Sequence, residues 1–167
     1  GSFVEIGGLS DPLDPYDPDR HCYNDVIVHN GKGHCDIYIY PKDVFQPTYS
    51  HSATLVGSQI YIIGNAWGKR EPKKYVSYTP VYVLNLDNFQ INKVETSGNM
   101  PGWIYDHKAA FDGSNTIILS QGTIFTGVTD TGVTYKNTNE TKKVFHYKEN
   151  TVRYSLCLKT MRWNQLD

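Results

Sequence analysis

Short apolar segments rich in β-branched and aromatic residues alternate with turn residues along the chain, and this pattern predicts strands. No segment of helical length shows a 3.6-residue apolar period. Three of the apolar segments end at a glycine or an asparagine: residues 3–8 (FVEIGG), 60–65 (IYIIGN) and 117–122 (IILSQG). Their last residues, at positions 8, 65 and 122, are 57 residues apart each time, which indicates an internal repeat.

Each repeat is expected to hold up to four antiparallel strands joined by turns. A strand that opens with histidine, at His51 and at His107, precedes the second and third segments. The third and fourth strands are predicted after each segment, at residues 23–28, 81–86 and 154–158 and at residues 36–40, 91–95 and 162–166. The first repeat lacks the His-led strand, because a position 57 residues before His51 falls outside the sequence. The prediction is one domain with repeats at 3–41, 45–96 and 101–167, preceded by a cloning remnant at residues 1–2.

This arrangement resembles the kelch repeat, which forms one blade of a β-propeller. The resemblance is carried by the His-led strands, by Gly7-Gly8 and its counterpart Gly64-Asn65, and by Trp163 in the last strand. It groups the chain with small bacterial kelch-domain proteins, and it implies an all-β fold of about 2.75 four-stranded antiparallel blades. Because a closed ring needs roughly four to eight blades, the ring would be incomplete in one chain. We therefore expect homo-oligomerisation or strand sharing through the open blade edges.

The long connections are predicted to lie together on one face, whereas the short turns lie on the other. They comprise residues 9–22, 41–50, 66–78, 97–106 and 123–151. Long loops on a rigid scaffold are where binding residues concentrate, and Tyr, Trp and Arg are enriched at interface hot spots. Met100 and Tyr147 lie in these loops, together with the ten predicted partner-binding residues: Tyr16, Arg20, Tyr49, Trp67, Lys69, Arg70, Tyr75, Trp103, Tyr105 and Tyr135.

Several of these residues have a structural alternative. Trp103 and Tyr105 precede a strand and could pack between neighbouring blades, and Trp67 and Arg70 could belong to a solvated loop. His51 and His107 occupy equivalent repeat positions, which favours structural hydrogen bonding over catalysis. Residues 136–153 are polar and charged, so they are expected to form a mobile insertion, with a short hairpin at Lys143–Tyr147.

Net charge limits the classes of partner to expect, and cysteine content indicates the cellular compartment. Sixteen Lys and Arg residues against seventeen Asp and Glu residues give a net charge of −1, so neither nucleic acid nor an anionic membrane is an expected partner. No apolar run approaches the roughly 18 residues of a membrane-spanning helix. Three cysteines without disulfide-type spacing favour a reducing compartment, and we expect a cytoplasmic protein.

Metal and catalytic motifs are weak in this sequence. His21-Cys22 and His34-Cys35 suggest a zinc pair, but a hairpin that places Val28 opposite Cys35 and Cys22 opposite Pro41 separates the two cysteines. The acidic segment at residues 11–19 could suit calcium, yet its spacing favours a rigid solvated turn. No catalytic motif is recognised, and no metal or cofactor is predicted.

The sequence thus favours a non-catalytic protein–protein interaction module that binds through its long loops. A role as an inhibitor or immunity-type partner of another protein is the more specific hypothesis. The alternatives from other classes are a glycan-binding propeller, in which aromatic rings stack on sugars between blades, and an enzyme of unknown reaction on a propeller scaffold.

Overall fold

The computed structural model describes residues 1–10, 21–66, 76–134 and 141–166. The part of the chain that it describes contains strands and turns and no helix, which confirms the all-β prediction. The strands are β1 Phe3–Leu9, β2 Cys22–His29, β3 Cys35–Ile39, β4 Ser52–Val56, β5 Gln59–Ile63, β6 Val81–Asn85, β7 Ile91–Lys93, β8 Ser97–Gly98, β9 Ile104–Tyr105, β10 Lys108–Phe111, β11 Thr116–Ser120, β12 Thr123–Thr134, β13 Thr141–Glu149, β14 Arg153–Cys157 and β15 Arg162–Leu166.

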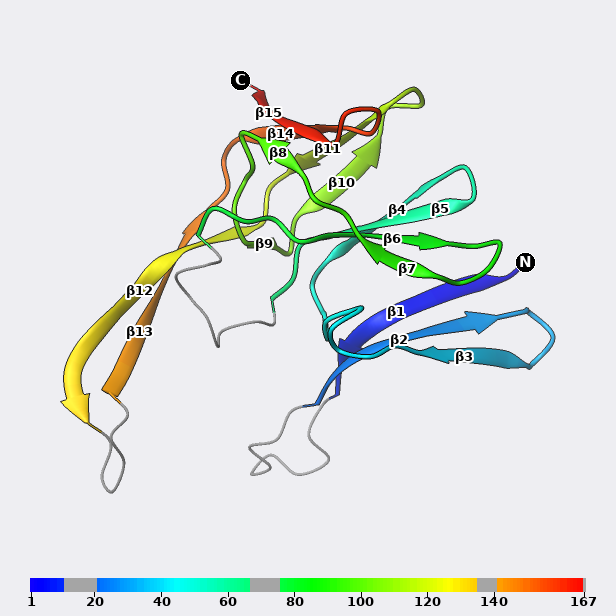
Figure 1. The fold of residues 1–167 in the computed structure, drawn as a ribbon, viewed down its shortest axis with the longest axis horizontal. Helices are drawn as coiled ribbons and strands as arrows, with labels where there is room; N and C mark the ends of the chain where they lie inside the picture. Colours follow the sequence, from blue (N-terminus) through cyan, green and yellow to red (C-terminus); the bar gives the residue numbers. More distant parts are fainter. Residues whose placement is uncertain (11–20, 67–75, 135–140, 167) are drawn as a thin grey trace.

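These strands form four sheets. The first sheet has the order β1-β2-β3, the second β4-β5-β6-β7, and the third β10-β11-β14-β15-β8. The fourth, which we call the arm sheet, has the order β13-β12-β9. The strands predicted for the three repeats therefore exist and pair antiparallel in the predicted order, and in the part of the chain that the structure describes β1 has no strand partner besides β2. No closed ring forms among the described residues (Figure 1).

The central strands of the second sheet, β5 and β6, are buried on both faces, because two hydrophobic clusters flank them. Ile60 and Ile62 of β5 pack in one cluster with Val26 of β2 and with Phe45, which lies in the link between β3 and β4. The alternate residues of β5, Tyr61 and Ile63, belong to the other cluster, which includes the following residues of the third sheet: Ile117, Leu119, Tyr154, Leu156 and Trp163. A strand that is apolar on both faces suits the middle of a stack of sheets.

The glycines at the ends of β1 and β5 make the same contact with the next repeat. Gly7 has φ +56°, and a Cβ atom there would lie 2.5 Å from the Thr48 carbonyl oxygen. Gly64 has φ +82°, and its Cβ would lie 2.4 Å from the Ile104 carbonyl oxygen. Both the left-handed backbone and the close approach require glycine. The repeat signal seen in the sequence is therefore a contact between successive sheets.

The hairpin of the first sheet has a register that differs from the predicted one. Val28 pairs with Asp36, and His29 pairs with Cys35. The prediction that Val28 lies opposite Cys35 is wrong by one residue, because the loop runs from Asn30 to His34. Its ends are joined by the Asn30 N–H, which donates to the His34 carbonyl at 3.2 Å.

The predicted insertion contains a long hairpin. β12 and β13 pair over most of their length, and β9 pairs with the start of β12. The prediction of a long loop over residues 123–151 with only a short hairpin is therefore wrong. Threonine, valine and aromatic residues favour strands even where both faces meet solvent, so a polar segment can still pair. In Figure 1 the hairpin extends away from the stacked sheets as an arm.

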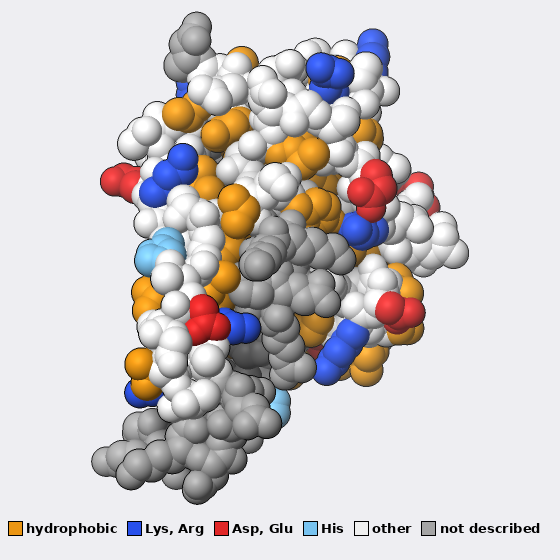
Figure 2. Space-filling model, turned by 60° about the vertical axis from the view of Figure 1, so that its left-hand side comes forward, with side chains coloured by type: hydrophobic (Ala, Val, Ile, Leu, Met, Phe, Trp, Pro, Cys, Tyr) orange, Lys and Arg blue, Asp and Glu red, His pale blue; other side chains and the backbone are white. Residues whose placement is uncertain are grey.

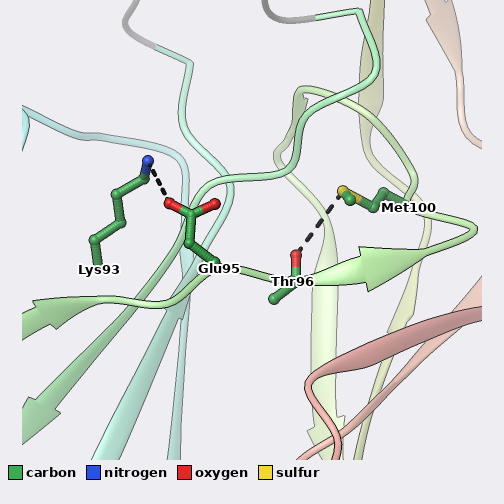
Figure 3. A network of polar contacts seen from close by, with 4 residues as sticks. All are labelled: Lys93, Glu95, Thr96 and Met100. Atoms are coloured by element: carbon green, nitrogen blue, oxygen red, sulfur yellow. Dashed lines mark hydrogen bonds and ion pairs between the residues drawn. The ribbon is translucent and has the colours of Figure 1, made fainter.

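The link at residues 97–106 also contains strands. β8 pairs in parallel with β15, through Ser97 with Arg162 and Gly98 with Trp163. The Trp163 indole N–H donates to the Thr96 hydroxyl at 3.1 Å, and that hydroxyl donates to the Met100 sulfur at 3.8 Å (Figure 3). This segment therefore covers part of the β15 edge. Of the two terminal edges expected to be open, the one on β15 is partly covered by its own chain.

Candidate functional site

The structure describes three of the ten predicted partner-binding residues, namely Tyr49, Trp103 and Tyr105. The other seven lie outside the described residues: Tyr16, Arg20, Trp67, Lys69, Arg70, Tyr75 and Tyr135. The acidic segment considered for calcium, at residues 11–19, also lies outside them.

Trp103 is an interior residue. Its side chain is 4% exposed, and its ring centroid lies 6.2 Å from that of Tyr78. Its carbonyl oxygen accepts a hydrogen bond of 2.9 Å from the Phe125 N–H at the base of the arm. A side chain with so little accessible surface cannot make a large contact with a partner, so we remove Trp103 from the set of contact residues. The structural alternative, in which this tryptophan packs between chain segments, describes its position better.

Tyr105 belongs to a group of four aromatic residues, which we call the arm aromatic cluster: Tyr105, Phe125, Phe145 and Tyr147. The ring centroids of Tyr105 and Tyr147 lie 6.1 Å apart at an interplanar angle of 85°. Phe125 lies 5.7 Å from Tyr147 and 6.2 Å from Phe145. Separations and angles of this kind are favourable for aromatic pairs.

Strand register explains why these rings meet. Phe125 of β12 is directly opposite Tyr147 of β13, and Phe145 is two residues from Tyr147 on the same strand. Residues two apart on a strand point to the same face. Tyr105 joins that face because β9 pairs with the start of β12, through Thr123. The alternation of Phe145 and Tyr147 in the sequence is the signal that could have identified this face beforehand.

The cluster combines a buried ring with an exposed one. Phe125 is buried, whereas the Tyr147 side chain is 40% exposed, and two further apolar residues of the arm, Val133 and Val144, are 53% and 47% exposed. Figure 2 shows apolar side chains distributed over this side of the molecule. The arm therefore exposes apolar side chains to solvent, and the buried Phe125 ring anchors it at its base.

The tyrosines of the cluster keep their protons at neutral pH. Burial raises the pKa of Tyr147 and is the largest cause of the raised pKa of Tyr105. The charges of Tyr147, Asp106 and Tyr49 raise the pKa of Tyr105 further, against a hydrogen bond with Thr123 that lowers it. Each phenol is thus a neutral donor and acceptor on an apolar ring, a combination that suits interfaces.

A second group of polar residues lies where β4 and β10 begin. The His107 Nε2 atom is 2.8 Å from the Ser52 hydroxyl oxygen, and the His51 Nδ1 atom is 3.4 Å from the Thr48 hydroxyl oxygen. The pKa of both imidazoles is lowered to about 4, mainly by burial; for His107 the charge of His51 contributes to this lowering and the charge of Asp106 opposes it. Both rings are therefore neutral at pH 7.

The Ser52–His107 pair resembles a nucleophile with its base, but its environment suits structure better. The His107 Nδ1 atom is buried without a hydrogen-bond partner, so no carboxylate orients the ring as in a catalytic triad. An imidazole with a pKa of about 4 is also a weak base for activating a hydroxyl near pH 7. The bond joins two neighbouring sheets, which agrees with the structural interpretation of the repeated histidines.

The described residues do not bring together a set of metal ligands, and their cysteines are not paired. Within the described ranges, no three His, Cys, Asp or Glu side chains come together as metal ligands. Cys22, Cys35 and Cys157 are free thiols, and burial raises the pKa of Cys22 to about 11. The described residues also include no helix with the length and apolar character needed to cross a bilayer.

No protein-family model and no curated protein matches the chain.

Proposed function

We propose that this protein is a non-catalytic protein-interaction module, built as a segment of a kelch-type propeller, that binds its partner through the arm aromatic cluster. The observation that carries the proposal is the exposed Tyr147 ring, which stands on Tyr105 and Phe125 at the base of a projecting hairpin. Because the Tyr147 ring already packs against two other rings, it loses little conformational entropy when a partner covers it. Rigid aromatic side chains of this kind often contribute most of the binding energy of an interface.

The rest of the arm supports the same conclusion. An isolated two-stranded hairpin is marginally stable in water, and Val133 and Val144 near its far end contribute little to the core because they are exposed. Apolar side chains on a projecting element gain burial when another surface covers them. We include in the proposal a role as an inhibitor or immunity-type partner, since a small binding module acts by covering a surface.

Protein binding is favoured over glycan binding by the distribution of the aromatic residues. Stacking on sugars between blades would repeat from sheet to sheet, whereas the arm aromatic cluster combines residues of β9, β12 and β13 alone. A single asymmetric patch suits one protein surface. A glycan array probed with the purified protein separates the two functions, because specific retention on a sugar would support the alternative.

The proposal is tested by differential capture from a lysate of the source organism. The bait variant combines Val144→Thr with Tyr147→Ser, which removes apolar surface from the arm. The matched control is Leu55→Thr on β4, because Leu55 is 59% exposed and lies away from the arm. We expect a protein that is retained by the wild type and by the control and lost from the arm variant. Equal retention by all three baits contradicts binding through the arm.

A further inference from the structure

The loop between β2 and β3 contains the one Asn-Gly dipeptide of the sequence, Asn30-Gly31. Both residues are exposed, as are the remaining residues of the loop up to His34. The backbone nitrogen that follows an asparagine can attack the side-chain amide carbon, because the two groups close a five-membered ring. Glycine favours this attack, since it has no Cβ atom to hinder the close approach. The loop therefore presents a reactive amide at an accessible position.

Hydrogen bonds within the loop hold the Asn30 side chain against the main chain that follows it. The Asn30 Oδ1 atom accepts a hydrogen bond of 2.9 Å from the Lys32 N–H and a longer one of 3.4 Å from the His34 N–H. A bond from the N–H two residues on is the pattern of an Asx turn, in which the side chain folds back along the backbone. The Asn30 side chain therefore folds over the Gly31 peptide, whose nitrogen is the attacking group.

The same two N–H groups favour the reaction electrostatically. When the Gly31 nitrogen bonds to the amide carbon of Asn30, negative charge develops on Oδ1, the atom to which both N–H groups donate. Donors aimed at an oxygen stabilise it more strongly once it carries charge, which is how an oxyanion hole lowers a barrier. Both donors are backbone groups that are in place before the attack. The loop therefore combines an oriented amide with preorganised donors.

We propose that Asn30 is a self-modification site, at which the folded β2–β3 loop promotes conversion of the asparagine to aspartate and isoaspartate. The Gly31 nitrogen forms a bond to Asn30 Cγ, the Cγ–Nδ2 bond breaks, and ammonia leaves with the proton of the Gly31 N–H. Water then adds to one of the two carbonyl carbons of the succinimide and breaks the bond from that carbon to nitrogen. Water is the one co-reactant, and the site does not depend on the proposed function of the arm.

The test compares the folded protein with a synthetic peptide that copies residues 26–36, which is too short to hold the loop. Both are incubated at neutral pH in water labelled with heavy oxygen, so that conversion during incubation is distinguished from conversion during digestion. Peptide mapping by mass spectrometry gives the rate at Asn30. We expect the folded protein to react about three- to tenfold faster than the peptide, the range for one hydrogen bond. An equal or slower rate in the folded protein overturns the proposal.

The chain contains its own matched control at Asn88. This residue is also exposed, and its Oδ1 atom accepts the Gln90 N–H at 3.0 Å, but Phe89 follows it in place of a glycine. The same peptide maps should show Asn88 unmodified while Asn30 is converted. Conversion of the two asparagines at the same rate would overturn the role given to Gly31.

A Lys32→Pro variant tests the donor, because proline has no N–H to give to Asn30 Oδ1. Lys32 has a negative φ, the sign that proline requires. The same substitution is made in the peptide, and the ratio of the folded rate to the peptide rate should fall about three- to tenfold. An unchanged ratio overturns the role of the loop. If this variant does not fold, the comparison of the wild-type protein with its peptide still decides the proposal.

Discussion

Gly64 illustrates how a single residue position joins two sheets. The residue adopts φ +82°, and its missing Cβ leaves room for the Ile104 carbonyl and for the ring of His107. The same position in the first repeat, Gly7, admits the Thr48 carbonyl. These glycines were visible in the sequence as the repeat signal, but their partners were not, because nothing local identifies the carbonyl that approaches each one.

Replacing Gly64 with alanine should lower the free energy of unfolding more than the same change at a glycine that has a similar backbone conformation but no close neighbours. Gly57 has φ +60° and no atom near its absent Cβ, so Gly57→Ala should cost about 1–2 kcal/mol for the left-handed conformation alone. Gly64→Ala adds a steric overlap and should lower the free energy of unfolding by about 3 kcal/mol or more. Urea denaturation of both variants measures the difference. Equal losses would contradict the close approach at Gly64.

The histidines make stability depend on pH. Both have a pKa of about 4 in the folded chain against an ordinary value of 6.5, so the unfolded chain binds protons first as the pH falls. The stability is fully present above about pH 6.5 and is lost progressively toward pH 4. One pKa unit corresponds to about 1.4 kcal/mol. Protonation of the two histidines should therefore lower the free energy of unfolding by several kcal/mol, as an order of magnitude, between about pH 6.5 and pH 4.

Chemical denaturation between pH 7.5 and 4.5 measures this loss, and NMR titration of the imidazole protons identifies the groups responsible. A variant of the exposed His34, His34→Gln, is the control and should keep the same pH dependence. Histidines at positions 51 and 107 that titrate near their ordinary value would contradict their burial.

At the scale of elements, the sequence predicted those strands that alternate clearly and end at turns, such as β5 between Gly57-Ser58 and Gly64. It failed for β12 and β13, since their many polar residues hide a pairing that buries little surface. It also failed for β8, because this strand has two residues and its contacts are with a distant segment, through the Trp163–Thr96 hydrogen bond and the pairing with β15. Phe125 and Phe145 were not predicted as site residues, because the contact between their rings depends on the β12–β13 hairpin, which the sequence did not predict.

Shortening the arm should leave the stacked sheets stable. Replacing residues 126–146 with Asn-Gly, a dipeptide that favours tight hairpins, keeps Phe125 opposite Tyr147. The expected cost is about 1 kcal/mol, the size of the lost Phe125–Phe145 pair. Thermal and urea unfolding provide the measurement. A loss of more than about 3 kcal/mol would mean that the arm is part of the folding core.

At the scale of the molecule, three sheets stack around two hydrophobic clusters, with the second sheet between the other two. The repeat in the sequence predicted this order, because successive units bury their faces against one another. The surface argued to bind, the arm, extends away from this stack, as Figure 1 shows. Its position could not be derived from the repeat, since the arm is an insertion into it.

The contact of the arm with another protein is the central claim, and photo-crosslinking tests it most directly. A benzophenone amino acid takes the place of Tyr147 in one protein and of Leu55 in the other, both expressed in the source organism. The account predicts a discrete crosslinked product with a second protein from position 147 and none from position 55. A product from position 55 alone, or the same products from both positions, would contradict binding through the arm.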